Sequence, residues 1–416
     1  MYNLKEKLSY EEILKEYHKG CKQEQNIGIE YERLPIHSKT KEAVSYYGIM
    51  GVCDLLKEFA EIDNWDYILD NNEIIGLKKL HTAITLEPGA QFELSVAPEK
   101  SVKELKSKID KINSKLEPLL DKYGITLLNY GVSPVSTYKN IQIIPKQRYK
   151  LMADYLWGIL SDVMMRETAG IQVGIDFESE EDAMRKLFIT NVISPFMTSM
   201  FANSSTRGGV DTGYKSFRGL AWLNTDNERC GFGSDLRQGL GFDNYVESVI
   251  NSPMIMINRN NSSIYFEGKL SFKEFMKYGY NGYEATLEDF KLHENLFFPE
   301  VRLREYLEIR NHDCVDERFM YAIPAIYKGI LYNDNAMDEI ESLFKTITST
   351  EIKEFRYSIP RGGLNTTINH KNAKDIAVEI QNIAYQSLTS KKDFDSEYML
   401  PIMELTKQGL SPCDLK

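Results

Sequence analysis

Segments that alternate apolar and polar residues with a period of two constrain this fold more than any other feature of the sequence. The clearest are NIGIEYER (26–33), AITLE (83–87), QFELSV (91–96) and GIQVGIDF (170–177). In the last segment, Ile171, Val173 and Ile175 share one face of a strand, because successive side chains point to opposite sides. Gln172 and Asp176 share the other face. These segments predict strands with one apolar and one polar face.

Amphipathic helices are predicted between these strands. Residues 101–123 place apolar side chains three and four positions apart, and Ser101 with Glu104 forms a capping box. Gly124 supplies a C-terminal stop. A second helix is expected after Ser179, where acidic residues fill the first turn.

Long helices mixed with short strands, without regular βαβ spacing, predict an α+β fold built on an antiparallel sheet. Helices are expected to cover one face of the sheet, so a functional site would lie on the polar face. The chain has no internal repeat and no long Pro/Gly/Ser linker, and residues 1–416 are therefore predicted to form a single domain.

Charge and cysteine content exclude some classes of protein. The net charge of −11 argues against a general nucleic-acid partner, which would more often meet a basic protein. The five cysteines are odd in number, widely spaced and without a Cys-x-x-Cys pair, as expected for reduced thiols. The charged N-terminus lacks an apolar signal core, and no uninterrupted apolar run approaches the length of a membrane span. We therefore expect a soluble cytoplasmic protein without a membrane partner.

Carboxylates gather on the predicted polar face. Glu30 and Glu32 are separated by one residue and point to the same side of their strand. Glu87 and Glu93 flank a Pro-Gly turn, and Glu308 shares a strand face with an arginine two residues later. Several same-face carboxylates are typical of a Mg²⁺ site that also holds substrate phosphates. The alternative is that each is a solvated carboxylate paired with a nearby lysine or arginine.

Seven segments in order resemble the plant-type glutamate–cysteine ligases. LEPGAQFELSVAP (86–98) is similar to the signature segment of that family, although Ala90 and Val96 stand where the family commonly has glycine. The other matching segments are IGIEYER (27–33), IIPKQRYKLM (143–152), MMRETAGIQVGIDF (164–177), MFANSS (200–205), SFRGLAWLNTDNERCG (216–231) and FFPEVRLREYLEIRNHD (297–313). The last hundred residues match weakly and are expected to form a covering helical layer.

The resemblance implies a glutamine-synthetase-like architecture, in which a curved antiparallel sheet forms a half-barrel or funnel covered by helices. It also implies an ATP-dependent ligase that joins the glutamate γ-carboxylate to the amine of cysteine through γ-glutamyl phosphate. The product would be γ-glutamylcysteine, the first intermediate of glutathione-type thiol synthesis. The implied cofactors are ATP and Mg²⁺, the implied partners are small-molecule substrates, and the protein would be a monomer or a homodimer.

The resemblance also assigns roles to single residues. The metal ligands would be Glu30, Glu32, Glu87, Glu93 and Glu308. Residues expected to bind or orient substrate are Arg148, Arg218, Trp222, Thr168 and Gln172. The residues expected beside the transferring phosphate are Arg229 and Arg310. Guanidinium groups suit both tasks, because their planar forks bind carboxylates and phosphates bidentately. A turn-fixing role for Glu87 and a core role for Trp222 remain alternatives.

Three departures from the family pattern leave the identity of the amine acceptor open. Ala169, Gly170 and Gly174 stand where plant members carry Cys, Thr and Asn. Smaller side chains here would reshape the pocket beside the acceptor, so a ligase that joins glutamate to a different amine is the alternative. A guanidino kinase would need an arginine-rich phosphate cage in place of Glu30 and Glu32. A binding module without catalysis is disfavoured, because the carboxylates and both substrate arginines are present.

Overall fold

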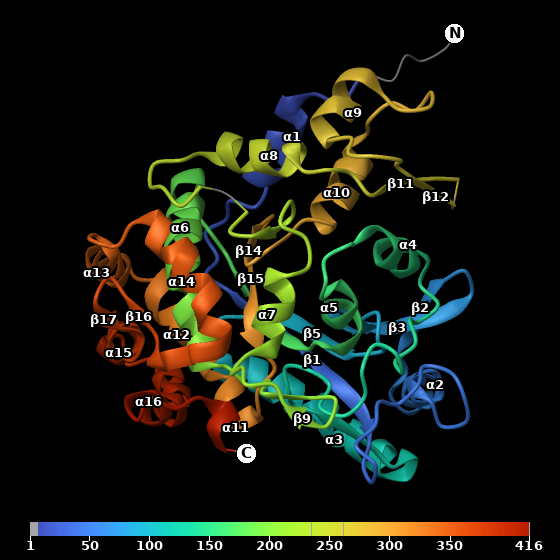
Figure 1. Ribbon diagram of the computed structural model, residues 1–416, viewed down its shortest axis with the longest axis horizontal. Coiled ribbons are helices and arrows are strands. Elements are labelled where there is room, and N and C mark those ends of the chain that lie inside the picture. Colours follow the sequence, from blue (N-terminus) through green and yellow to red (C-terminus); the bar gives the residue numbers. More distant parts are fainter. Residues whose placement is uncertain (1–6, 234, 261, 416) are drawn as a thin grey trace.

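The computed structural model describes residues 7–233, 235–260 and 262–415, with a nine-stranded sheet at its centre (Figure 1). Its strands are β1 (Ile27–His37), β2 (Asp66–Asp70), β3 (Glu73–Lys79), β4 (Thr82–Leu86), β5 (Phe92–Glu99), β6 (Ile125–Leu128), β7 (Gly170–Ile175), β14 (Val301–Leu303) and β15 (Leu307–Asp313). Their order is β14-β15-β7-β1-β5-β4-β3-β2, with β6 also paired to β1. Every pairing is antiparallel. The predicted α+β fold built on an antiparallel sheet is confirmed.

Strand β1 shows how the sequence pattern becomes a two-faced sheet. Ile27, Ile29 and Tyr31 are buried on its apolar face, whereas Glu30 and Glu32 alternate with them and are only half-buried. The apolar face packs on helices, including α3 (Val102–Tyr123) and α12 (Ala322–Leu331). The carboxylates consequently lie on the opposite face, where we expected a site.

The two predicted helices form where their capping signals lie. The Ser101 hydroxyl accepts the backbone N–H of Glu104 at the start of α3, and Gly124 ends this helix in the left-handed conformation, with φ of +61°. The Ser179 hydroxyl likewise accepts the N–H of Asp182 at the start of α6 (Glu180–Met200). Helix α6 packs on β14 and β15.

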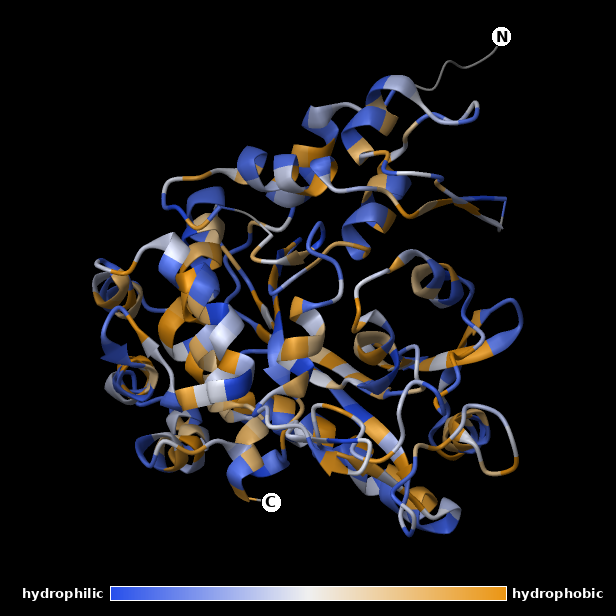
Figure 2. Ribbon diagram, viewed as in Figure 1, coloured by the Kyte–Doolittle hydropathy of each residue, from blue (hydrophilic) through white to orange (hydrophobic). Residues whose placement is uncertain are grey.

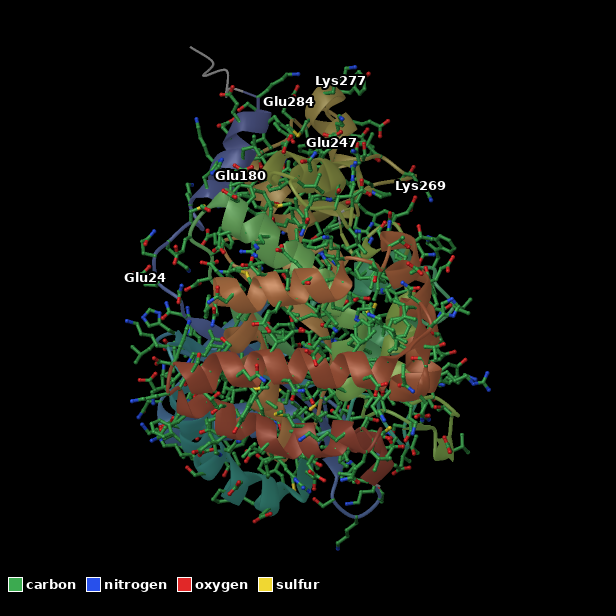
Figure 3. All side chains as sticks on the ribbon, turned by 90° about the vertical axis from the view of Figure 1, so that its left-hand side faces the viewer. Glu24, Glu180, Glu247, Lys269, Lys277 and Glu284 are labelled. Carbon is green, nitrogen blue, oxygen red and sulfur yellow. The ribbon has the colours of Figure 1, made fainter. Side chains whose placement is uncertain are left out.

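The C-terminal part of the chain forms the expected helical layer. It consists of α11 (Glu317–Met320), α12, α13 (Asp334–Phe344), α14 (Ser349–Gly362), α15 (Ala373–Ser390) and α16 (Leu400–Lys407), with the short helices η1 (Gly363–Asn365), η2 (Phe394–Met399) and η3 (Pro412–Leu415). Figure 3 shows these helices lying across one side of the molecule. Helix α15 contacts α6, α12, α13 and α16, and α12 contacts β1 and β7. The layer therefore buries the apolar face of the sheet.

The remaining elements lie around the sheet and its helical layer. The helices are α1 (Tyr10–His18), α2 (Val52–Asp63), α4 (Gln147–Tyr155), α5 (Ser161–Glu167), α7 (Phe217–Leu223), α8 (Phe242–Asn251), α9 (Phe272–Tyr278) and α10 (Leu287–Asn295). The short strands are β8 (Thr206–Arg207), β9 (Val210–Asp211), β10 (Cys230–Gly231), β11 (Met256–Arg259), β12 (Ser262–Tyr265), β13 (Phe298–Pro299), β16 (Thr367–Ile368) and β17 (Lys371–Asn372). In Figure 1, α1, α8, α9 and α10 gather at one end of the molecule.

Hydropathy follows these layers. In Figure 2 the helices carry both hydrophobic and hydrophilic stretches, and many hydrophilic ones lie toward the periphery. Within the described residues, no helix combines the length and apolar character needed to cross a bilayer. Charged side chains such as Glu24 and Lys269 project from the surface (Figure 3).

Candidate active site

A polar cavity of about 210 Å³ opens on the face of the sheet that carries the carboxylates. Its walls come from β1, β5, β7 and β15 together with α4, α5 and α7. The predicted residues that line it are Glu30, Glu32, Glu87, Glu93, Glu308, Arg148, Arg218, Arg310, Thr168, Gln172 and Trp222. Segments separated by up to 280 residues in the sequence are thus brought to one site.

Strand register places two of the carboxylates directly opposite each other. In the antiparallel pair β1–β5, Glu32 faces Glu93, and Thr85 on β4 faces Glu93 from the other side. Like charges at facing positions destabilise a sheet. The Thr85 hydroxyl donates to Glu93, and the Gln172 amide lies 3.1 Å from Glu32 Oε1 and 3.4 Å from Glu93 Oε1. These neutral donors moderate the repulsion without cancelling the charge.

Burial and mutual repulsion hold these carboxylates toward the neutral acid. Burial, followed by the Glu308 charge, raises the pKa of Glu30 to about 7. Burial and the charge of Glu87 also raise the pKa of Glu32. Burial and the charge of Glu30 raise that of Glu93. A bound cation would relieve this repulsion, because it stabilises the ionised form of each group.

Glu308 has the opposite electrostatic environment. Burial favours its neutral form, but the charges of Arg302 and Arg310 outweigh burial and lower its pKa to about 2. Arg302 Nε and Nη2 form a fork around it, with Nε–Oε2 at 3.0 Å and Nη2–Oε1 at 2.9 Å. Arg310 also donates to Oε1. Glu308 is therefore a charged carboxylate whose countercharges are protein side chains.

Glu87 lies at the turn between β4 and β5. Its backbone N–H donates to the Gln91 carbonyl at 3.0 Å, and its carbonyl accepts the Ala90 N–H at 2.8 Å. Its side chain accepts the Tyr149 hydroxyl at 3.0 Å, so it joins α4 to this turn while lining the cavity. Ala90 is almost fully buried at φ of +67°, a conformation that glycine adopts more readily.

Three arginines reach the cavity with unused hydrogen-bonding capacity. The buried Nε atoms of Arg148, Arg218 and Arg310 have no hydrogen-bond partner within the described part of the chain. The guanidinium carbons of Arg218 and Arg310 lie 5.8 and 5.9 Å from the Trp222 ring centre. Arg148 enters from α4 on another wall. Anionic substrate groups would satisfy these donors.

Arg229 is not brought to this cavity. It is 1% exposed, and its Nε donates to Asp226 at 2.7 Å. Its other nitrogens donate to the carbonyls of Leu296 and Pro253 at 2.7 and 2.9 Å and to the Tyr155 hydroxyl at 3.3 Å. These bonds hold loops together and engage the guanidinium in the protein interior, outside the cavity lining. The expected contact with a transferring phosphate is not formed by this geometry.

Thr168 and Gln172 reach the cavity, but both are already bonded within the protein. The Thr168 hydroxyl donates to the Met164 carbonyl at 2.6 Å. The Gln172 carbonyl oxygen accepts Arg310 Nη1 at 2.9 Å, and its amide faces two carboxylates. Gln172 thus orients Arg310 relative to the carboxylates.

The glycines on β7 make room for two cavity residues. A Cβ added to Gly170 would lie 2.4 Å from Arg218 Nη2 and 2.8 Å from the His312 carbonyl oxygen. A Cβ added to Gly174 would lie 3.3 Å from the Tyr306 ring. Ala169 is fully buried away from the cavity lining. Two of the three departures therefore shape the cavity through their neighbours.

The cavity also contains residues to which neither the sequence pattern nor the resemblance assigns a role. They include Gln91, Tyr149, Asn295, Phe298, Arg302, Arg304 and Tyr306. Arg302 could have been assigned to the site from the sequence, because a hairpin between its strand and the next one places it opposite Glu308. Tyr306 carried little signal, because it lies in the turn between β14 and β15 and reaches the site by packing over Gly174.

The carboxylate oxygens in the cavity are the type of ligand that a hard cation binds. Carboxylate oxygens are the ligands that Mg²⁺ prefers, and Glu30, Glu32 and Glu93 lack a full countercharge of their own. Across the described ranges, however, no group of three or more His, Cys, Asp or Glu side chains converges tightly enough to hold a metal. Binding would require these side chains to change rotamer toward one point.

Comparisons with known proteins assign the family. A sequence model of the glutamate–cysteine ligase family 2 matches residues 26–415. Glutamate–cysteine ligase A, chloroplastic, from Oryza sativa subsp. indica is 32% identical over 98% of this chain and 84% of its own length. The chloroplastic enzyme from Arabidopsis thaliana is 31% identical over 98% of this chain and 79% of its own length.

A solved structure shares the fold at low sequence identity. The glutamate–cysteine ligase of Francisella tularensis, solved in complex with AMP, is 14% identical and superposes with a TM-score of 0.55. The match covers 93% of this chain and 82% of that one.

The expected cytoplasmic location is wrong by these comparisons, because the plant relatives are named chloroplastic enzymes. The family match extends to residue 415 and so includes the helical layer, where the resemblance had been weak. With the motif order, the cavity and the matched length in agreement, this chain belongs to the glutamate–cysteine ligase family 2.

Proposed function

We propose that the protein is an ATP-dependent ligase that joins the γ-carboxylate of glutamate to the amine of cysteine. The observation that carries this proposal is one cavity that combines a carboxylate cluster with three arginines holding unused donors. The cluster suits a cation and its phosphates, and the arginines suit the carboxylates of glutamate. The names of the plant relatives support the same substrates.

The reaction proceeds in two steps. A γ-carboxylate oxygen of glutamate attacks the γ-phosphorus of ATP, which forms γ-glutamyl phosphate and releases ADP. The amine of the acceptor then attacks the acyl carbon, loses a proton and expels inorganic phosphate. The protein contributes mainly position and electrostatic stabilisation, because phosphoryl transfer requires little covalent participation by side chains.

Each wall of the cavity has a role in this scheme. Glu30, Glu32 and Glu93 would hold Mg²⁺, and Glu87 and Glu308 are further candidates from the adjoining strands. Bound Mg²⁺ would neutralise phosphate charge and orient the nucleotide. Glu308 keeps Arg302 and Arg310 in place, and so presents the positive charge of Arg310 beside the same centre.

Glutamate binds through the arginines. Arg148 and Arg218 lie on different walls and grip the two carboxylates of the substrate, while Arg310 stabilises charge on the transferring phosphoryl group. The guanidinium groups of Arg218 and Arg310 lie near the Trp222 ring. Thr168 and Gln172 line the same site. Arg229 has no part in this scheme.

The acceptor pocket is reshaped relative to the plant pattern. Arg218 and Tyr306 fill the space above Gly170 and Gly174, where larger side chains would stand. Cysteine is the acceptor we propose, and a different amine is the alternative that these packing changes favour. The discrimination between cysteine and 2-aminobutyrate is expected to be only about 10- to 200-fold, because a thiol adds little hydrogen bonding.

The proposal includes the arrangement of the whole chain. Residues 1–416 act as one catalytic domain, and the curved sheet forms a half-barrel of the glutamine-synthetase type around the cavity. The open antiparallel order and the helical cover support this arrangement. The enzyme is a monomer or a homodimer that acts on small molecules.

Coupled ADP release tests the proposal. Purified protein with ATP and MgCl2 should release ADP only when glutamate and an amine acceptor are both present, and a screen of amino acids should rank cysteine first. Mass spectrometry of mixtures of competing acceptors should find γ-glutamylcysteine as the main product. A different γ-glutamyl amide as the main product would mean that another amine, and not cysteine, is the acceptor. ADP release independent of glutamate would overturn the ligase assignment.

A further inference from the structure

Asp313, the last residue of β15, is a buried carboxylate that lies behind the cavity wall. It is 1% exposed and accepts three hydrogen bonds. Oδ2 accepts the Asn203 backbone N–H at 2.8 Å and the Ser204 hydroxyl at 2.6 Å. Oδ1 accepts the Ser216 hydroxyl at 2.8 Å. A carboxylate buried in this way requires a structural or functional reason, because its desolvation is costly.

Ser204 and Ser216 connect Asp313 to the first turn of α7 through hydrogen bonds. The Ser204 oxygen accepts the backbone N–H of Arg218 at 3.1 Å. The Ser216 oxygen caps α7 by accepting the backbone N–H of Gly219 at 2.9 Å. Each hydroxyl has a single proton, and Asp313 accepts both of them. With their protons held by Asp313, both serine oxygens direct a lone pair at a backbone N–H group in the first turn of α7.

The side chain of Arg218 depends on this backbone position. Apart from one bond of 2.9 Å from Nη2 to the Arg310 carbonyl, its guanidinium has few partners, and its Nε finds none among the residues the structure describes. The space for the guanidinium is fixed by Gly170, where a Cβ would lie 2.4 Å from Nη2. A small rotation of α7 would therefore move the guanidinium out of its place.

We propose that Asp313 is a positioning residue for glutamate binding. It holds the first turn of α7 through Ser204 and Ser216 so that the Arg218 fork faces the substrate carboxylate. Asp313 touches neither substrate nor phosphate. The inference rests on the proposed function, because it takes Arg218 as a glutamate ligand.

The Asp313→Asn variant tests this role. It keeps the size of the side chain but replaces one acceptor oxygen with a donor, so one serine loses its orienting partner. We expect the KM for glutamate to rise about 10- to 100-fold, by analogy with the loss found when the hydrogen-bond partner of a metal-ligating side chain is removed. The KM for ATP should stay unchanged. Ser216→Ala should give a smaller shift of the same kind.

Asp395 supplies a matched control. It is 2% exposed and accepts the backbone N–H groups of Val102 and Lys103 at 2.9 and 3.3 Å, far from the cavity in the helical layer. Asp395→Asn should lower stability without changing the KM for glutamate relative to that for ATP. A glutamate KM that is unchanged in folded Asp313→Asn would overturn the inference, as would an equal rise of both KM values.

Further variants separate the possible failures. If Asp313→Asn does not fold, Ser204→Ala and Ser216→Ala carry the test, and wild-type glutamate KM in both would overturn the inference. In combination with Arg218→Lys, Asp313→Asn should add little to the loss, because both changes act on the same contact. Full additivity would again overturn it. Wild-type protein without glutamate-dependent ADP release would instead refute the proposed function, and this inference with it.

Discussion

Replacing Glu30 by glutamine should stabilise the protein while it abolishes the ligase reaction. Within the described contacts, the Glu30 side chain makes no hydrogen bond that glutamine would lose. Burial and the Glu308 charge raise its pKa from 4.5 to about 7. Because the folded state then binds more protons than the unfolded state, stability should fall as the pH rises from 4.5 to 7. Glutamine does not titrate, so the variant should escape this loss.

The magnitude follows from the pKa difference. A shift from 4.5 to about 7 corresponds to about 3 kcal/mol at 1.36 kcal/mol per unit. For a chain of 416 residues the unfolding entropy is about 0.9 kcal/mol/K, so the melting temperature should rise by about 4 °C. Glu30→Gln should therefore exceed wild type by about this amount at pH 8 and match it near pH 4.

Two further variants serve as controls in scanning calorimetry or urea titration. Exposed Glu24→Gln should change stability by less than about 0.5 kcal/mol at either pH. Glu308→Gln should destabilise by about 3–5 kcal/mol, because it leaves Arg302 and Arg310 without their partner. Equal stability of Glu30→Gln and wild type at pH 8, or a gain that does not depend on pH, would refute the electrostatic reasoning.

Three further predictions address the cavity and its turn. Arg148→Lys and Arg218→Lys should each raise the KM for glutamate about 10-fold or more and the KM for ATP much less, because lysine keeps the charge but loses the fork; steady-state kinetics would contradict this if both KM values rose equally. Glu32→Gln should fold but lose nearly all turnover or require far more MgCl2, and wild-type turnover in this variant would remove it from the proposed metal ligands. Ala90→Gly should change the free energy of unfolding by less than about 1 kcal/mol, since relief of the left-handed conformation is offset by a lost buried methyl group and a more flexible unfolded chain. A loss above about 2 kcal/mol by denaturant titration would contradict this and show that packing dominates at this turn.

The two-residue period was enough to predict where the carboxylates would point. Glu30 and Glu32 share a strand face whatever the neighbouring strands are, and so their placement followed from local geometry alone. That Glu93 faces Glu32 depends on the register between β1 and β5, which α2, β2, β3 and β4 separate along the chain. The order of strands across the sheet could not be read from the pattern.

Failures of prediction arose where tertiary packing decides the role of a residue. The resemblance assigns Arg229 to the site, yet Asp226, three residues earlier, pairs with it in the protein interior. Tyr306 was missed because its place depends on the absence of a side chain at Gly174 on another strand. In both cases a distant segment completes the placement: the carbonyls of Leu296 and Pro253 hold Arg229, and Gly174 leaves room for Tyr306.

The facing pair of Glu32 and Glu93 has a consequence for how cation binding would be measured. Because burial and neighbouring charge raise both pKa values, these two carboxylates retain their protons to a higher pH than a free glutamate does. A cation that takes these oxygens must displace protons into the solvent. The heat observed in titration calorimetry would then depend on the ionisation enthalpy of the buffer, and its slope across buffers would count the protons released. The apparent affinity for the cation would weaken as the solution becomes more acidic, because protons and the cation compete for the same carboxylate oxygens.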